Sequence, residues 1–243
     1  MTDHAVVDGR SGARSGGPHP GVLAIVSLVI FLASLAATPV LTGGEWFIPA
    51  FAPAADAAGF FRDNATAAQV AGMLQFGSAV PLGIFAATAY ARQLRLGVRV
   101  PGPAIGFFGG IDAAVFLMLS GLIMWVLGRP EVVADTALAQ ALAVLSYLTG
   151  GVGFVVGLGL LVAGIAVPSL ILGFMPRWLA WAGLVIAALS ELSFLSLVLE
   201  PLQFLLTVGR FGGLVWLIAA GFLLPRRRAA ANQEGRTQRV APR

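Results

Sequence analysis

The chain has 243 residues, of which 58% are hydrophobic and only 11% are charged. Soluble domains carry about a quarter charged residues, so this composition excludes a water-solvated globular domain and indicates an integral membrane protein. All 15 basic residues are arginine. They form short clusters beside apolar segments, a pattern that sets membrane topology and does not indicate nucleic-acid binding.

Two residue types that carry chemistry are missing from the apolar segments. Cysteine is absent, and the two histidines, His4 and His19, both precede the first apolar segment. Disulfides, iron–sulfur clusters, thiol nucleophiles and histidine-based haem or metal sites within the membrane are therefore excluded. The sequence also has no P-loop and no paired-aspartate motif. We expect no cofactor, no metal and no enzymatic activity, with a carboxylate-only enzyme as the one catalytic class left open.

The N-terminal part combines a polar tail, one apolar run and a mixed segment. Residues 1–20 are expected to form a disordered cytoplasmic tail. The apolar run at 21–41 has about 20 residues, which favours a retained helix over a signal peptide, whose apolar region has about 7–15. The aromatic-rich segment at 42–65 predicts either an interfacial loop with a short surface helix or a lid over an outward-facing cavity.

The remainder of the chain predicts five further spans and a basic tail. Pro81 is expected to kink the first of them. The pairs Gly153/Gly157 and Gly209/Gly213 form small-residue faces that are expected to pack closely against helices of the chain, a second copy or a partner protein. The predicted fold is an all-α, polytopic transmembrane bundle with six spans, at 21–41, 66–90, 104–127, 139–167, 177–199 and 203–224, and the tail covers 226–243.

The distribution of arginine predicts the orientation of the bundle. Six spans place both termini on one side, and all but three of the 15 arginines then fall on that side. The exceptions are Arg62 and Arg129, on the opposite side, and Arg210 within the membrane. The positive-inside rule therefore predicts N-in/C-in topology in a bacterial cytoplasmic membrane. The cluster Arg226, Arg227 and Arg228 is expected to end the last helix and to contact anionic lipid.

Two opposite charges are expected at one depth in the last hairpin. Glu191 lies ten residues before Pro201 and Arg210 lies nine after it, so both are about 13–15 Å below the turn. This depth is near the middle of a hydrocarbon core of about 30 Å, where an unpaired charge costs at least ~2.5 kcal/mol. We therefore predict a Glu191–Arg210 ion pair that faces the bundle interior. Gln203 and Thr207 share the helical face of Arg210 and are expected to support it.

Asp112, about 12 Å from the cytoplasmic end of the third span, is the remaining charge expected inside the membrane. Two interpretations are open. It is a protonatable group beside a cytoplasmic vestibule, as proton coupling would require, or it accepts hydrogen bonds from Ser146 or Tyr147 on a neighbouring helix.

The last two spans resemble those of a known group of proteins. Residues 175–184 read MPRWLAWAGL, and residues 212–225 read GGLVWLIAAGFLLP before a basic stop. Over about a third of the chain, this resembles uncharacterised bacterial multi-pass membrane proteins grouped as a domain of unknown function. Those proteins share a Pro-Arg/Lys-Trp-Leu turn before the penultimate span and a Trp-Leu pair in the last one. Many carry an acid near the position of Arg210, which is basic here. The resemblance implies the fold and no activity.

Two functional hypotheses follow from the sequence. In the first, the protein is a non-catalytic scaffold or sensor whose buried Glu–Arg pair fixes how two helices dock. In the second, it is a small-solute or proton-coupled transporter that uses Asp112, Glu191 and Arg210.

Overall fold

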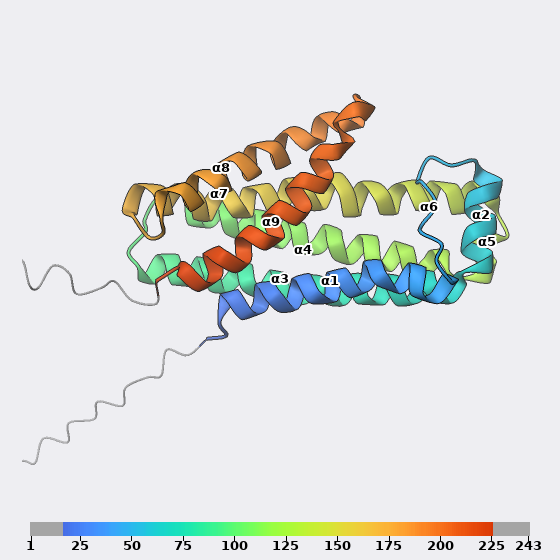
Figure 1. The fold of residues 1–243 in the computed structure, drawn as a ribbon, viewed down its shortest axis with the longest axis horizontal. Helices are drawn as coiled ribbons and strands as arrows, with labels where there is room; N and C mark the ends of the chain where they lie inside the picture. The colour runs from blue at the N-terminus through green and yellow to red at the C-terminus, as the bar shows by residue number, and fades with distance from the viewer. Residues whose placement is uncertain (1–16, 226–243) are drawn as a thin grey trace, which may run out of the picture.

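The computed structural model describes residues 17–225 as a bundle of long helices (Figure 1). Both predicted tails lie outside the described residues, except for positions 17–20. The arginine cluster at 226–228 is among the residues outside this range, and so is its expected contact with anionic lipid. The helices are α1 (Pro20–Thr42), α2 (Ala54–Asp63), α3 (Ala65–Arg95), α4 (Gly102–Leu127), α5 (Pro130–Val133), α6 (Thr136–Leu148), α7 (Phe154–Leu172), α8 (Arg177–Leu192) and α9 (Phe204–Leu223). A π-helical turn, η1 (Thr149–Gly153), joins α6 to α7, and two 3₁₀ turns, η2 (Ser193–Leu197) and η3 (Glu200–Gln203), form the tip of the α8–α9 hairpin.

The six-span, all-α prediction is confirmed. Six segments of the described chain are long and apolar enough to cross a membrane, and the described residues contain no strand. The fourth span is longer than predicted, because α7 continues through Pro168 to Leu172. A proline removes only one backbone hydrogen bond, and packing against neighbouring helices lets a membrane helix accommodate that loss. The end of this span, expected at residue 167, was therefore placed too early.

Glycine lets the central helices approach each other closely. A Cβ atom on Gly72 of α3 would lie 2.5 Å from the carbonyl oxygen of Gly121 on α4, which is closer than real contacts allow. The two predicted small-residue faces also pack inside the bundle: a Cβ on Gly157 would lie 2.6 Å from the backbone nitrogen of Ala113, and one on Gly213 would lie 2.7 Å from Leu158. These two faces therefore pack against helices of the chain itself, which is one of the three alternatives expected.

One end of the bundle brings together the two ends of the described chain (Figure 1). A Cβ on Gly221 of α9 would lie 2.6 Å from the backbone nitrogen of Gly21 at the start of α1. Arg92, near the end of α3, is buried and donates a 3.0 Å hydrogen bond to the carbonyl oxygen of Leu224, just after α9. This end carries the loops that the arginine distribution predicts to be cytoplasmic.

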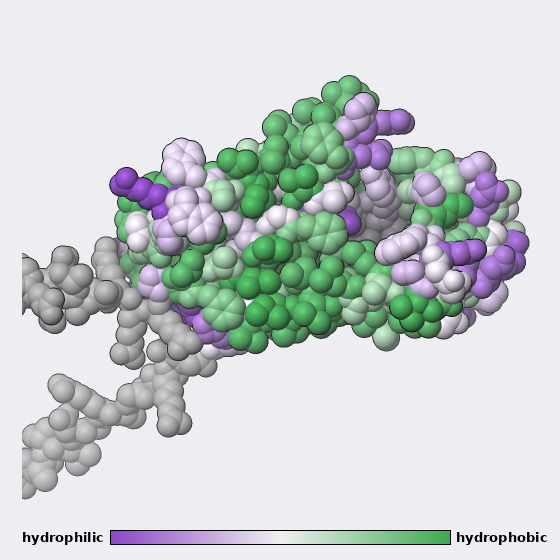
Figure 2. Space-filling view, in the orientation of Figure 1, coloured by the Kyte–Doolittle hydropathy of each residue, from purple (hydrophilic) through white to green (hydrophobic). Residues whose placement is uncertain are grey.

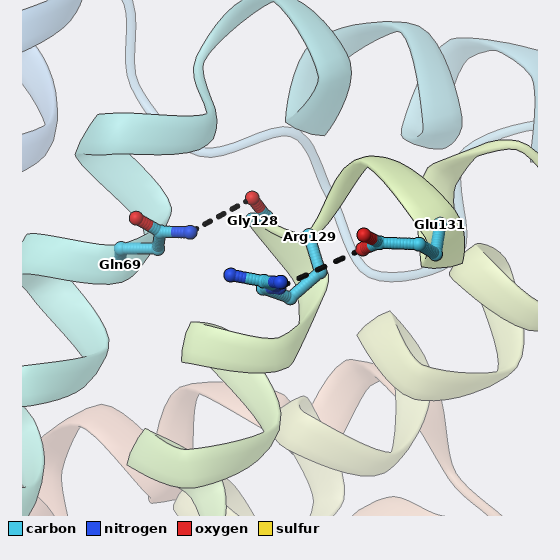
Figure 3. Close-up of polar contacts among 4 residues, drawn as sticks. All are labelled: Gln69, Gly128, Arg129 and Glu131. Carbon is cyan, nitrogen blue, oxygen red and sulfur yellow. Dashed lines mark hydrogen bonds and ion pairs between the residues drawn. The ribbon is translucent and has the colours of Figure 1, made fainter.

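The opposite end is closed by the short helices α2 and α5 and by hydrogen bonds to helix ends. Arg62 of α2 donates to the carbonyl oxygen of Val133 in α5 at 2.9 Å. Figure 3 shows Gln69 of α3 donating to the carbonyl oxygen of Gly128, which follows α4, at 3.0 Å, and the exposed pair Arg129–Glu131 at 3.6 Å beside it. These contacts satisfy backbone groups that a helix end leaves without partners.

The sides of the bundle are apolar, as lipid contact requires. Exposed Val, Ile, Leu and Phe side chains occur on every long helix, and Figure 2 shows hydrophobic residues covering the middle of the visible face. The protein is therefore a multi-pass integral membrane protein.

Candidate functional site

The two charged residues of the last hairpin do not meet. A Cβ on Gly209 of α9 would lie 2.6 Å from Ser190 Oγ and 3.3 Å from Ser190 Cα, so α8 and α9 touch at these positions. Glu191 directly follows Ser190, and Arg210 directly follows Gly209. The two charged side chains therefore start from the same depth in the bundle, as expected. No ion pair joins them in the described structure, and Glu191 Oε1 and Arg210 Nε are both buried without a hydrogen-bond partner. The predicted Glu191–Arg210 pair is wrong.

The direction of the side chains explains the separation. Side chains on an α-helix tilt toward its N-terminus, and α8 and α9 run in opposite directions. The carboxylate of Glu191 therefore tilts toward the end of the bundle where α1 begins, and it lies against Gly159 of α7, where an added Cβ would be 2.9 Å from Oε1. The guanidinium of Arg210 tilts toward the end that carries α2 and α5 and reaches Gly150 in η1. Nine residues of helical backbone, about 13 Å, separate these two contacts.

Arg210 is held by one carbonyl group and two aromatic rings. Its Nη2 donates a hydrogen bond to the carbonyl oxygen of Gly150. Its Cζ lies 5.7 Å from the ring centroid of Phe31 and 5.8 Å from that of Phe154, within the range of cation–π attraction. These contacts are neutral, so they stabilise the guanidinium without cancelling its positive charge.

The π-helical turn supplies the carbonyl group that Arg210 uses. Three of the five residues of η1 are glycine, which is a poor α-helix former. A π turn places an extra residue in the helix and is frequent at functional sites. Gly150 also has no room for a side chain, since an added Cβ would lie 3.0 Å from Ser120 Cβ and 3.2 Å from Gln75 Nε2.

A chain of polar groups crosses three helices beside Arg210. Gln75 Nε2 of α3 donates to Ser120 Oγ of α4 at 2.8 Å, and Ser120 Oγ donates to the carbonyl oxygen of Ser146 on α6, also at 2.8 Å. Ser146 therefore belongs to this chain. Its predicted hydrogen bond to Asp112 is wrong, as is that from Tyr147, because neither bond occurs in the described structure.

These groups line a cavity of about 270 Å³ in the half of the bundle that carries α2. Its wall is mainly aromatic and aliphatic, and Phe47, Ile48 and Ala50, between α1 and α2, are part of it. The polar lining consists of Ser34, Gln75, Ser120, Ser146, Tyr147 and Arg210. Arg210 is the only charged side chain among the described residues that line it. The segment 42–65 therefore contains a short helix, α2, as one interpretation expected, and it contributes to the wall of a cavity, as the other expected.

A second recess of about 350 Å³ reaches Arg210 from the side of the bundle. It shares Tyr147 and Arg210 with the first cavity, and Gln203 and Thr207 also line it. The structure therefore brings together four of the predicted site residues, one from α6 and three from η3 and α9. In Figure 2 the visible face is hollowed between the tip of the α8–α9 hairpin and the end that carries α2.

Asp112 and Glu191 lie outside both spaces. Asp112 packs against α7, where a Cβ on Gly157 would be 2.7 Å from Oδ2, and Glu191 packs near Gly159. Residues two apart on a helix point in nearly opposite directions, so the two carboxylates lie on opposite flanks of α7. Asp112, Glu191 and Arg210 therefore do not line one common space in the described structure.

Four important residues of the site were missed: Phe31, Gln75, Ser120 and Gly150. Gln75 carried the clearest signal, because a glutamine in the outer half of a span needs a polar partner. The Gly150-Gly151 pair indicated that the α-helix is weak at this point, because glycine has a low helix propensity.

Comparison of the chain with protein families, with curated proteins and with solved structures found no match. The resemblance of the last two spans to a group of uncharacterised membrane proteins therefore stays a prediction.

Proposed function

We propose that this membrane protein binds an organic monoanion, such as a carboxylate with an apolar body, at Arg210. One observation carries the proposal: Arg210, a half-buried residue, lines a cavity in the outer half of the bundle, and no acidic residue lines that cavity with it. A positive charge within a membrane is costly unless a counter-ion accompanies it. A bound anion would supply that counter-ion.

The chemistry of the cavity fits a carboxylate. A guanidinium presents planar N–H donors that match a carboxylate, and Nη2 is already used by Gly150 while Nη1 donates to no described residue. The hydroxyl of Tyr147, on the same cavity wall, is a second donor for the anion. Phe31, Phe47 and Phe61 form apolar walls for the remainder of the molecule. A volume of about 270 Å³ is near the lower limit for small-molecule sites.

These features favour the sensor hypothesis over the transporter hypothesis. Below Arg210 the bundle is closed by fully buried Phe154, Leu158 and Leu214. The carboxylates that the transporter hypothesis uses, Asp112 and Glu191, line neither space. We therefore infer a non-catalytic, ligand-binding bundle. The arginine bias and the resemblance support a bacterial cytoplasmic membrane as its location.

Binding of benzoate and hexanoate to the purified protein in lipid nanodiscs, measured by calorimetry, tests the proposal. Arg210→Gln removes the charged hydrogen-bond donors of this site. A hydrogen bond to a charged group contributes a factor of about 10 to 150 in affinity, so we expect the variant to bind both anions more weakly by that factor. Arg129→Gln, which removes an exposed arginine at the outer end, is the matched control and is expected to change nothing. Equal affinity of Arg210→Gln and the unchanged protein for both anions would refute the proposal.

A further inference from the structure

The face of α9 that leads to Arg210 is polar from the hairpin tip downward. Gln203, Thr207 and Arg210 are spaced four and three residues apart, so they lie on one face of the helix. All three line the lateral recess, and Phe204 and Leu206 stand beside them. The result is a polar track about 10 Å long, at ~1.5 Å per residue, with apolar edges.

The track opens toward lipid because most of the exposed side chains at the tip of the hairpin are apolar, with Glu200 as the exposed charged residue beside them. The side chains of Phe194, Leu197, Val198 and Leu199 are all more than half exposed, and Val198 reaches 84%. In Figure 1 this tip stands away from the bundle and does not extend to the end that carries α2 and α5. Exposed apolar residues of this kind are suited to the hydrocarbon layer and not to water.

The route from water is covered more tightly than the route from lipid. Gln140 of α6 holds the 43–53 segment by a 2.9 Å hydrogen bond from Nε2 to the carbonyl oxygen of Ala52. Phe51 packs edge-on against Tyr147 with ring centroids 5.6 Å apart, and Phe47 packs against Phe61 at 6.3 Å. No comparable hydrogen bond crosses from α6 to Gln203 or Thr207 in the described structure.

We propose that the ligand is a single-chain amphiphile, a long-chain carboxylate, that enters sideways from the outer leaflet between α6 and α9. Its headgroup passes from Gln203 to Thr207 and binds Arg210 and Tyr147. Its chain stays against the apolar edges of the recess, whereas a short anion places its body against Phe31, Phe47 and Phe61. This inference rests on the proposed function, since it names the kind of anion that Arg210 holds and the side from which it arrives.

Photo-crosslinking in nanodiscs with palmitate that carries a chain diazirine tests this inference. We expect the diazirine to label α6 and residues 200–210. Unlabelled palmitate is expected to compete at least about tenfold more strongly than hexanoate. Uncharged hexadecanol is expected not to compete. Arg210→Gln is expected to reduce labelling at least about tenfold, and Thr207→Val, which keeps the shape and removes the hydroxyl, about threefold. Ser196→Ala, at the hairpin tip but outside the recess, is the matched control.

The possible outcomes separate the two proposals. Lateral entry is supported if palmitate competes more strongly than hexanoate and if labelling falls in both Arg210→Gln and Thr207→Val. If hexanoate competes as well as palmitate, and Arg210→Gln abolishes binding while Thr207→Val does not alter it, lateral entry is refuted and the anion site stands. If no carboxylate binds in a manner that depends on Arg210, both proposals are refuted.

Discussion

Ser190 on α8 touches Gly209 on α9, and this contact aligns the residues that follow, Glu191 and Arg210, while their side chains diverge. Equal depth is therefore not sufficient for an ion pair between antiparallel helices. Each long side chain tilts toward the N-terminus of its own helix, and the two tilts are opposite. The separation leaves Arg210 with its charge directed into a cavity.

The first prediction concerns the energetic coupling of Glu191 and Arg210. Because the two side chains are not in contact, a double-mutant cycle with Glu191→Gln and Arg210→Gln is expected to give a coupling energy below about 0.5 kcal/mol. The measurement is the free energy of unfolding in mild detergent. A buried ion pair would lose about 3–5 kcal/mol when one partner is removed, so a coupling of that size would contradict the structure.

The second prediction concerns Gly150, which has no room for a methyl group. Gly150→Ala places a Cβ against Ser120 and Gln75 and is expected to destabilise the protein by about 1–3 kcal/mol. Gly151→Ala is the matched control in the same turn, because its Cβ would lie 3.7 Å from Leu206, an ordinary contact. Thermal unfolding of both variants checks this, and equal stability would mean that the polar chain beside η1 is not packed as described.

The third prediction concerns the cytoplasmic end of the bundle. Arg92→Met keeps the length of the side chain and removes the buried hydrogen bond to Leu224, so we expect a loss of about 1.5–3 kcal/mol in unfolding free energy. Arg95→Met, one turn further along α3 and exposed, is the control and is expected to be neutral within about 0.5 kcal/mol. A neutral Arg92→Met would show that this contact does not hold α3 to the end of α9.

The fourth prediction concerns topology. The chain has no cysteine, so single cysteines can be introduced without background. A membrane-impermeant maleimide is expected to label Glu131→Cys on intact cells and Arg99→Cys only after permeabilisation, because α4 separates these exposed positions. If both cysteines are labelled on intact cells, α4 does not span the membrane. If only Arg99→Cys is labelled on intact cells, the orientation is inverted and the cavity faces the cytoplasm.

The fold was largely predictable because hydropathy along the chain is a one-dimensional signal and the bilayer acts on it directly. Six long apolar segments leave few alternatives to six spanning helices. Helix ends were less predictable, as the continuation of α7 through Pro168 shows. A proline in a span does not by itself end the helix, since neighbouring helices compensate for it.

The site was only partly predictable because it depends on which helices are neighbours. Thr207 and Gln203 were found from spacing on the same helix as Arg210. The link from Gln75 to Ser120 and Ser146 joins three helices, and no periodicity within one segment reports such a contact. The π turn that supplies the Gly150 carbonyl group was missed for a local reason: glycine indicates a weak helix but not its hydrogen-bond pattern.

The most direct measurement is a crystal structure of the protein with 4-bromobenzoate, in which anomalous scattering locates the bromine. The account predicts a bromine peak in the cavity lined by Phe47 and Phe61, with the carboxylate hydrogen-bonded to Arg210. A structure in which the bromine lies elsewhere and Arg210 is paired with Glu191 would contradict it.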